Sequence, residues 1–225
     1  MKPINQARLR EPALFVKMER ELYSAVISDA LDQVGVRNHT ANPKIRPLKS
    51  SMVAAGRAAT ILCRTVNKIP ERPYEMIIRG LDRLKPGEIS FISVEGAGAA
   101  IWGELLSTAS RARGARGAII DGDTRDVKKI IEMRYPVFST GITPTDSLGR
   151  VDVVGIGKTV SSGEAKVRTG DIVFADVDGV VVVPTEVEKE VLKLSFDKVR
   201  KEDIVRRDLL KGKLLREVWK KHRVL

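Results

Sequence analysis

The sequence has little of the residue types on which several structures and chemistries depend. Its 225 residues include one cysteine and two histidines. A single cysteine allows no intrachain disulfide and no cysteine-built metal cluster. Its place in the apolar run from Ala58 to Cys63 is typical of a buried thiol in a reducing compartment. Neither His39 nor His222 has a cysteine, histidine or carboxylate at the spacing of a metal site, so we expect neither to bind metal.

Long apolar runs are also missing. No stretch approaches the roughly 18 apolar residues that indicate a membrane-spanning helix, and the chain starts with a charged segment that lacks the apolar core of a secretory signal. We therefore expect a soluble cytoplasmic protein with no membrane partner. The motifs G-x-S-x-G and G-x-x-x-x-G-K-[ST] are absent too, which argues against serine hydrolases of the elbow type and against P-loop NTPases.

The chain has an excess of basic residues, 40 Lys and Arg against 29 Asp and Glu, and a formal net charge of +11. An excess of this sign raises the question of nucleic-acid binding. Most of it lies from Lys189 onward, where 13 basic side chains alternate with 6 acidic ones. Because these acids interrupt the positive field, we expect an amphipathic helix that packs on a neighbouring subunit and do not expect nucleic acid as a partner.

The hydrophobic pattern predicts one α/β domain over residues 1–225, and 43% hydrophobic residues supply its core. Helices are predicted over residues 13–34 with a break near Ser28, and over 74–84, 99–113 and 127–133; strands are predicted over 52–66, 89–94 and 118–120. Their alternation indicates a central βαβ unit with parallel strands. Short β-branched runs at 151–154, 166–167, 172–175 and 179–183 predict a second sheet. The N-terminal helices end near residue 35, and a basic helix from Glu186 closes the chain, interrupted at Gly212.

A glycine-containing turn, Gly96-Ala97-Gly98, lies between the strand that ends at Val94 and the predicted helix. Glycine permits close approach of a ligand to the backbone, and a helix N-terminus attracts anions. The third small residue of a dinucleotide fingerprint is replaced by Ile101. The turn favours a small carboxylate or phosphate, while a dinucleotide site and a simple tight turn remain alternatives.

The run from Asp121 to Asp126 follows a predicted buried strand, at the end where open α/β sheets place their sites. In one interpretation it is a solvated turn, and Asp126 caps the next helix. In the other, Asp126 is an oxygen ligand for Mg²⁺, which typically takes one or two carboxylates and keeps several waters, and Arg125 clamps a substrate carboxylate or keto oxygen. Glu104, on the preceding helix, is a candidate to hold or deprotonate a metal-bound water.

An ordered series of motifs then resembles the RraA-like family over roughly residues 23–202. The series comprises Ser28 to Leu31, Ala55 to Ala58, Gly96 to Gly98, Ile101 to Leu106, Gly117 to Asp126, Tyr135 to Phe138 and Thr169 to Pro184. The resemblance implies a swivelling β/β/α sandwich with terminal helices, assembled as a homotrimer or a homohexamer with sites between subunits. The family includes class II 4-hydroxy-4-methyl-2-oxoglutarate aldolases, which also decarboxylate oxaloacetate, and regulators that inhibit an endoribonuclease.

Carried over by motif, the resemblance gives roles to particular residues. Asp126 is implied as the direct ligand of Mg²⁺ or Mn²⁺, and Arg125 as the contact to a small 2-keto acid. Gly103, Leu105 and Leu106 are implied as substrate-binding residues, through the backbone N–H groups of the two leucines for the carboxylate, and Glu104 as an acid near the metal water. Glu202, from a neighbouring subunit, and Asp121 are the implied outer residues of the site.

This assignment has a physical basis. Cleaving a C–C bond next to a 2-keto acid leaves an enolate of pyruvate, which a chelated cation and Arg125 both stabilise. Because Arg125 and Asp126 are both present, the sequence favours a metal-dependent lyase, an aldolase or decarboxylase, over the alternative. The alternative is a non-catalytic regulator that binds a ribonuclease or RNA through Lys189 to Arg223.

Overall fold

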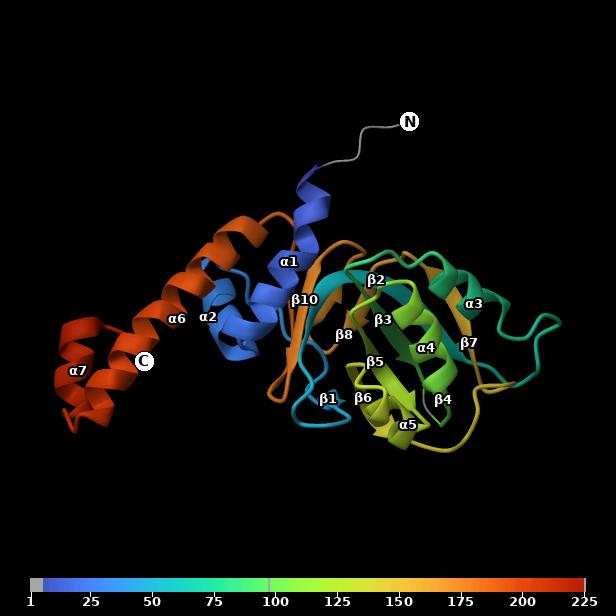
Figure 1. The fold of residues 1–225 in the computed structure, drawn as a ribbon. Helices are drawn as coiled ribbons and strands as arrows, with labels where there is room; N and C mark the ends of the chain where they lie inside the picture. The colour runs from blue at the N-terminus through green and yellow to red at the C-terminus, as the bar shows by residue number, and fades with distance from the viewer. Residues whose placement is uncertain (1–5, 97, 225) are drawn as a thin grey trace.

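The protein is an α/β structure in which helices flank a strongly curled sheet (Figure 1). The computed structural model describes residues 6–96 and 98–224. The strands in this part of the chain are β1 Arg46–Pro47, β2 Ala54–Thr65, β3 Glu88–Glu95, β4 Ala100–Trp102, β5 Gly117–Thr124, β6 Val137–Ile142, β7 Val151–Ile156, β8 Val160–Ser162, β9 Ala165–Val167, β10 Ile172–Asp176 and β11 Gly179–Val183. The helices are α1 Gln6–Glu21, α2 Ser24–Gln33, α3 Glu75–Asp82, α4 Glu104–Ala112, α5 Val127–Glu132, α6 Glu188–Leu210 and α7 Leu215–His222.

The centre of the fold is a run of parallel strands joined by helices. β2, β3, β5 and β6 lie side by side and pair in parallel, and α3, α4 and α5 connect them in turn. The predicted βαβ unit is therefore confirmed, and it extends by one further strand, β6, which the sequence pattern did not single out. Helical crossovers of this kind bring the carboxyl ends of the strands to one edge of the sheet.

The prediction of a second sheet from residues 151–183 is wrong in part. β7 and β10 both pair antiparallel with β2, and β11 pairs with β10 in the same sheet, whereas β8 and β9 form a separate two-stranded sheet. The 12 residues of β2 allow this, because Ala54 to Arg57 pair with β10 and Ile61 to Thr65 pair with β7. With two partners on one side of β2, the sheet curls toward a barrel.

Alternation along the strands divides the core between the two faces of this sheet. In β5, Ala118 and Ile120 pack in the cluster that also contains Trp102 and Ile130, whereas Ile119 packs in the interior of the curled sheet. Successive side chains of a strand point to opposite faces, so both faces of β5 are buried. Its continuous apolar run, which predicted a buried strand, reflects this double coverage.

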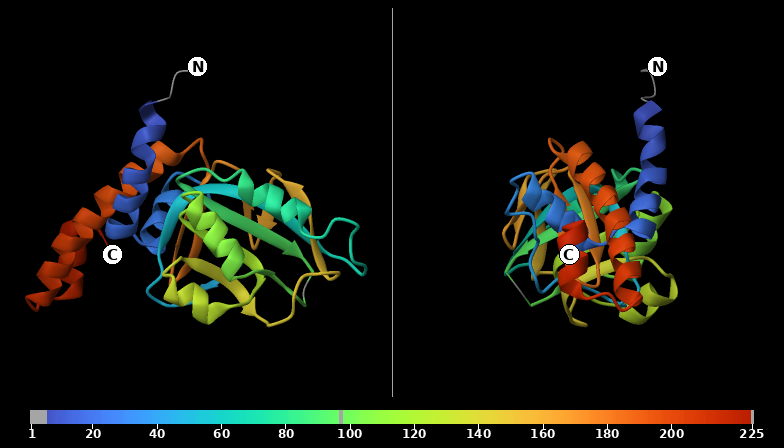
Figure 2. Two further views of the ribbon diagram at one scale, coloured as in Figure 1. Left: turned by 45° about the vertical axis from the view of Figure 1, so that its right-hand side comes forward. Right: turned by 90° about the vertical axis from the view of Figure 1, so that its left-hand side faces the viewer.

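The terminal helices form a third layer beside β10 and β11 (Figures 1 and 2). Phe15, Ile27 and Val191 pack there against Phe174 and Val183 of the sheet. The N-terminal helical segment breaks after Glu21 and not near Ser28, because the N–H and hydroxyl of Ser24 both bond to the buried carboxylate of Asp176 at the start of α2.

Within the described residues, no helix is both long and apolar enough to cross a membrane.

The predicted basic helix is interrupted at Gly212 as expected, but the residues after this break form a second helix, which the sequence analysis did not foresee. α6 extends beyond the sheet. After Gly212, whose φ is +80°, α7 folds back along the end of α6 (Figure 2). The turn is held by the carboxylate of Asp208, which accepts hydrogen bonds from Lys213 and His222. Together the two bonds hold the pKa of Asp208 well below its usual range.

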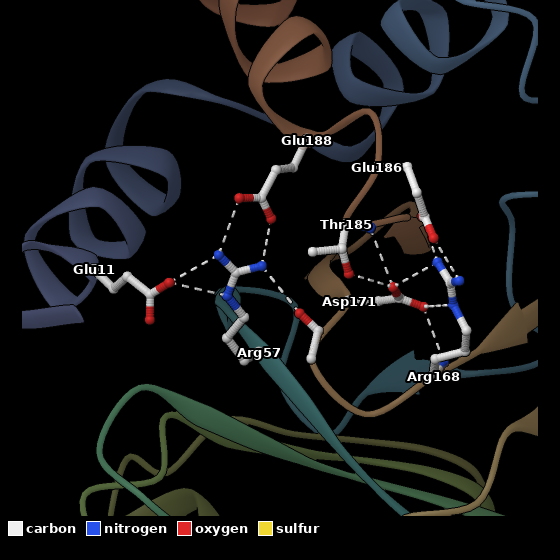
Figure 3. Close-up of polar contacts among 8 residues, drawn as sticks. Glu11, Arg57, Arg168, Asp171, Thr185, Glu186 and Glu188 are labelled. Carbon is white, nitrogen blue, oxygen red and sulfur yellow. Dashed lines mark hydrogen bonds and ion pairs between the residues drawn. The ribbon is translucent and has the colours of Figure 1, made fainter. Parts of the chain in front are cut away.

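Two arginines fasten the terminal helices to the sheet (Figure 3). Arg57 of β2 donates to Glu11 of α1, to Glu188 at the start of α6 and to the backbone oxygen of Gly170. Arg168 reaches Glu186 and the buried carboxylate of Asp171. Asp171 also accepts the N–H and hydroxyl of Thr185. Because these carboxylates and guanidiniums bond to one another, we infer that the cluster stabilises the fold and is not a binding site.

Candidate active site

A cavity of about 370 Å³ opens beside the ends of β4 and β5, between α3 and α4. The residues that line it are Tyr74, Ile77, Ile78, Ala100, Ile101, Trp102, Gly103, Leu105, Leu106, Arg125, Asp126, Asp146 and Ser147. The structure thus brings together Gly103, Leu105, Leu106, Arg125 and Asp126, all of which were predicted as site residues. Glu104, Asp121 and Glu202 do not line the cavity.

Asp126 lies immediately after β5 in an uncommon backbone conformation. Its φ is +60°, in the left-handed region that Asp and Asn adopt more readily than other non-glycine residues. One carboxylate oxygen, Oδ2, accepts the backbone N–H of Glu104 at 3.1 Å, at the start of α4. Within the described chain, no side chain caps α5, so the interpretation of Asp126 as its cap is wrong. The carboxylate is instead positioned at the N-terminus of α4, where the helix dipole favours a negative charge.

Gly103 is the residue that allows this approach. A Cβ atom at position 103 would lie 2.6 Å from Oδ2 of Asp126, closer than nonbonded atoms can pack. After Gly103 the chain enters the first turn of α4, in which the N–H groups of Leu105 and Leu106 have no partner within the helix. The two backbone donors suit an anionic ligand, and the carboxylate of Asp126 beside them suits a cation.

Arg125 connects the two acids of the cavity. Its Nε lies 3.9 Å from Oδ2 of Asp126, and its Nη1 lies 3.1 Å from Oδ1 of Asp146. Its backbone N–H donates to the oxygen of Trp102 at 3.0 Å, which joins the ends of β4 and β5. With 38% of its side chain exposed, the guanidinium remains accessible to a ligand from the cavity.

Asp146 and Tyr74 belong to the site but were not foreseen from the sequence. Asp146 lies in the connection between β6 and β7, and its Oδ2 accepts the hydroxyl of Tyr74 at 2.6 Å and the N–H of Leu148 at 3.2 Å. Partial burial raises the pKa of Asp146, but these two hydrogen bonds and the charge of Arg125 outweigh it, so the pKa is lowered overall. The hydrogen bond between the Tyr74 hydroxyl and Asp146 raises the pKa of Tyr74.

The sequence contains little that would indicate Tyr74 and Asp146 as site residues. Tyr74 has a φ of +65°, a local strain that no sequence pattern shows, and Asp146 lies 20 positions beyond Asp126 in a polar loop. The loop reaches the site because the N–H of Ala100 donates to the oxygen of Thr145 at 2.9 Å, a contact between distant parts of the chain.

The donor set of the cavity fits a hard cation bound through one carboxylate. Oδ1 of Asp126 accepts no hydrogen bond from any residue that the structure describes. Nor does the described part of the chain contain a group of three or more His, Cys, Asp or Glu side chains placed to bind a metal. Mg²⁺ is commonly held by one or two carboxylates, with water in its other positions. Asp126 is therefore a suitable ligand for such an ion, with most of the coordination left to water and substrate.

The other predicted acids lie outside the cavity. The carboxylate of Glu104 accepts the hydroxyl of Thr108 at 2.8 Å on the exposed side of α4. The prediction that Asp121 lies at the end of its strand is wrong, because β5 continues to Thr124. Asp121 is bonded to Asn42 at 2.8 Å and Ser162 at 2.6 Å.

Glu202, on α6, accepts the hydroxyl of Tyr23. Its implied role concerns a neighbouring subunit and stays a prediction.

A helix had been predicted directly after the glycine turn, and this prediction is wrong. Gly98 is followed by β4, and α4 begins only at Glu104. A short apolar triplet such as Ala100 to Trp102 fits a strand or a helix equally well, and pairing with β5 decides for the strand. The anion-receptive helix start thus lies at Gly103, while Ala97 of the glycine turn lies outside the described residues.

The chain matches one protein family over most of its length. The model of the RraA-like family, described as Aldolase/RraA, matches residues 24–182. A protein of Halalkalibacterium halodurans, named as a candidate 4-hydroxy-4-methyl-2-oxoglutarate aldolase, is 28% identical over 180 residues, which are 80% of each chain.

Two solved structures have the same fold. An uncharacterized protein from Pseudomonas syringae pv. tomato superposes with a TM-score of 0.79 at 25% identity, over 97% of this chain and 99% of that one. Streptomyces coelicolor RraAS2, described as an unusual member of the RNase ES inhibitor RraA protein family, superposes with a TM-score of 0.76 at 24% identity, over 87% of this chain and 97% of that one.

Proposed function

Because the chain belongs to the RraA-like family, we propose that it is a divalent-metal-dependent lyase that cleaves a C–C bond of a short 2-keto acid and releases pyruvate. The candidate reactions are aldol cleavage of substrates of the 4-hydroxy-4-methyl-2-oxoglutarate type and decarboxylation of oxaloacetate. The observation that carries the proposal is the placement of Arg125 and Asp126 in one cavity with the start of α4. The name of the Halalkalibacterium halodurans relative supports it.

Each group of the cavity has a task in such a reaction. Asp126 would hold Mg²⁺ or Mn²⁺ through the oxygen that is not bonded to Glu104. When bound, the cation supplies a Lewis acid for the negative charge that develops on the keto oxygen. Arg125 adds a positive charge with a planar pair of donors that matches a carboxylate or keto acid. The N–H groups of Leu105 and Leu106 bind the substrate carboxylate at the start of α4.

A proton must also be moved. In aldol cleavage the C4 hydroxyl of the substrate loses its proton as the C3–C4 bond breaks. We assign the acceptor to Glu104, acting through water, because this half-buried residue follows Gly103 and its backbone N–H is bonded to Asp126, although its carboxylate does not itself line the cavity. This role requires the carboxylate of Glu104 to release the hydroxyl of Thr108.

Assembly is part of the proposal. We propose a homotrimer or homohexamer in which α6 of a neighbouring subunit brings Glu202 near the metal site. The large apolar side chains exposed on α6 and α7 are consistent with such a contact, since Leu210 is 81% exposed and Trp219 41%. The same surface supports the second candidate function, a regulator that binds a ribonuclease, which the name of the Streptomyces coelicolor structure raises for that protein.

Pyruvate release decides between these functions. The full-length protein is assayed with oxaloacetate and with 4-hydroxy-4-methyl-2-oxoglutarate, each with Mg²⁺ and with Mn²⁺, against the rate of the free ions. We expect metal-dependent release of pyruvate that is lost in Asp126→Asn. Rates equal to those of the free ions with both metals and both substrates would reject the lyase.

A further inference from the structure

We propose that Asp146 is a positioning residue, which holds the guanidinium of Arg125 where the carboxylate or keto oxygen of the substrate binds, and that Tyr74 anchors Asp146. This inference rests on the proposed lyase function and applies to both candidate reactions, because each substrate is a 2-keto acid. It is drawn from contacts within one protein chain, so it does not depend on what a neighbouring subunit adds to the cavity.

Asp146 makes the closer of the two carboxylate contacts to Arg125. Nη1 of Arg125 lies 3.1 Å from Oδ1 of Asp146, whereas its Nε lies 3.9 Å from Oδ2 of Asp126. That oxygen of Asp126 also accepts the backbone N–H of Glu104 at 3.1 Å. Because the attraction between opposite charges weakens with distance, Asp146 has the stronger hold on the guanidinium.

This difference increases when the site is loaded. Once Asp126 binds a cation, its negative charge is offset and it attracts Arg125 less. Among the described residues that line the cavity, Asp146 is then the carboxylate that still holds Arg125. An ion pair through Nη1 leaves other N–H groups of the planar guanidinium for a ligand. Asp146 can therefore position Arg125 without occupying all of its donors.

Asp146 is itself fixed by its side chain and its backbone. Its Oδ2 accepts the hydroxyl of Tyr74 at 2.6 Å and the N–H of Leu148 at 3.2 Å, while Oδ1 faces Arg125. Its backbone forms a β-bridge with Ala100, the first residue of β4. Each carboxylate oxygen thus has its own partners, and one rotamer of Asp146 satisfies all of them.

Tyr74 anchors Asp146 from the start of α3. Its φ is +65°, in a region that is uncommon for an aromatic residue and costs free energy. Its backbone oxygen accepts the N–H of Ile78 at 3.0 Å in the first turn of the helix. A strained conformation persists only where other contacts outweigh its cost, and the hydrogen bond from the Tyr74 hydroxyl to Asp146 is such a contact.

The test measures binding of pyruvate, a 2-keto acid without the bond that is cleaved, to the full-length protein with Mg²⁺ by calorimetry. Tyr74→Phe changes no charge, so its effect reports on the position of Asp146. We expect Kd for pyruvate and KM for oxaloacetate to rise about three- to tenfold, the value of one hydrogen bond, while kcat changes less and metal affinity stays the same.

Asp146→Ala should weaken binding at least as much. Loss of a negative charge alone would strengthen the binding of an anion, so tighter binding of pyruvate by this variant would overturn the inference. Tyr74→Phe should have no further effect in the Asp146→Ala background, because Tyr74 acts through Asp146. A further loss of the same size would show that the hydroxyl contacts the ligand itself, and it would also overturn the inference.

Asp82→Ala is the matched control. Asp82 lies on α3 with its side chain 70% exposed, pairs with Arg113 at 4.0 Å and does not line the cavity. This variant loses a carboxylate from an arginine on the same helix, and it should bind pyruvate as the wild type does. If Asp146→Ala does not fold, Tyr74→Phe decides alone.

Crystal structures of the wild type and the variants give a readout that does not depend on turnover. We expect the guanidinium of Arg125 to leave its place in Tyr74→Phe and in Asp146→Ala. An unmoved Arg125 or unchanged pyruvate binding in Tyr74→Phe would overturn the inference and leave the lyase intact. If the wild type releases no pyruvate above the rate of the free ion, the lyase fails. In that case, weaker pyruvate binding in Tyr74→Phe would still support the positioning role, while no pyruvate binding by the wild type would overturn both proposals.

Discussion

Replacing Asp126 with Ala and with Asn separates the chemical role of its charge from its structural role. Ala removes the acceptor for the N–H of Glu104 at 3.1 Å and places a less tolerant residue at φ +60°. Asn keeps an acceptor oxygen, and it adopts the left-handed conformation as readily as Asp. Asp126→Asn keeps this acceptor and the backbone conformation, but it loses the charge and replaces the proposed metal-binding oxygen by an NH2 group. Any effect of this variant on turnover therefore reports on the carboxylate as a metal ligand.

The expected magnitudes follow from these contacts. A backbone hydrogen bond at a partly exposed site is worth about 0.5–1.5 kcal/mol, and Ala in the left-handed region costs about 1 kcal/mol. The ion pair with Arg125 at 3.9 Å is exposed and adds little. Asp126→Ala should therefore lose about 1.5–2.5 kcal/mol, a fall in Tm of about 3–10 °C in a chain of this size, while Asp126→Asn should melt close to the wild type. Neither loss unfolds a domain with about 5–15 kcal/mol of stability.

The assay combines scanning calorimetry with pyruvate release. We expect both variants to lose metal-dependent turnover, down to the rate of the free ion, because Asp126 is the single protein carboxylate proposed to hold the cation. Turnover near the wild-type rate in Asp126→Asn at low micromolar metal would refute the metal site, even within the same family. Unfolding of Asp126→Ala would show instead that the carboxylate has a larger structural role than one hydrogen bond.

Further substitutions test other parts of the cavity. Arg125→Lys keeps the charge and loses the planar pair of donors, so KM for the keto acid should rise about tenfold or more while metal affinity, measured by calorimetry, stays unchanged. Gly103→Ala forces Asp126 away from its place, 2.6 Å from the new Cβ, and should lower kcat/KM about a hundredfold without unfolding the protein, since φ at position 103 is extended. Tyr74→Phe removes a hydrogen bond that lowers the pKa of Asp146, so this pKa should rise in an NMR titration. A carboxyl group whose pKa is lowered by folding stabilises the folded state at pH values above the pKa that it has in the unfolded chain, near 3.9, and this stability is lost as the pH falls through the folded-state pKa. The variant should therefore be less stable than the wild type above about pH 4 and equally stable in stronger acid. Unchanged stability across this range would show that the hydrogen bond contributes nothing.

Local sequence determined the parallel core and the place of the central charged pair. Strands were recognised where β-branched and small apolar residues form short runs, as in β3 and β5, and helices where the apolar period is close to 3.6, as in α3 and α5. In a strand–helix–strand unit the helix must pack back on the sheet, and this requirement makes the crossover right-handed and the two strands parallel. Arg125 and Asp126, which come directly after β5, therefore lie at the functional edge of the sheet on local information alone.

Tertiary structure decided what surrounds that pair. The pairing of β4 with β5 turned a predicted helical start into a strand, and β7 and β10 joined the central sheet because β2 is long enough to hold both. Asp146 and Tyr74 reached the cavity through long-range contacts, such as the bond from Ala100 to Thr145, that no local pattern encodes. Residues far apart in the chain meet only once strand order is settled, and strand order depends on which partners bury the most apolar surface together. The charged pair that suits a keto acid can thus be read from the sequence, whereas the cavity around it exists only in the folded chain.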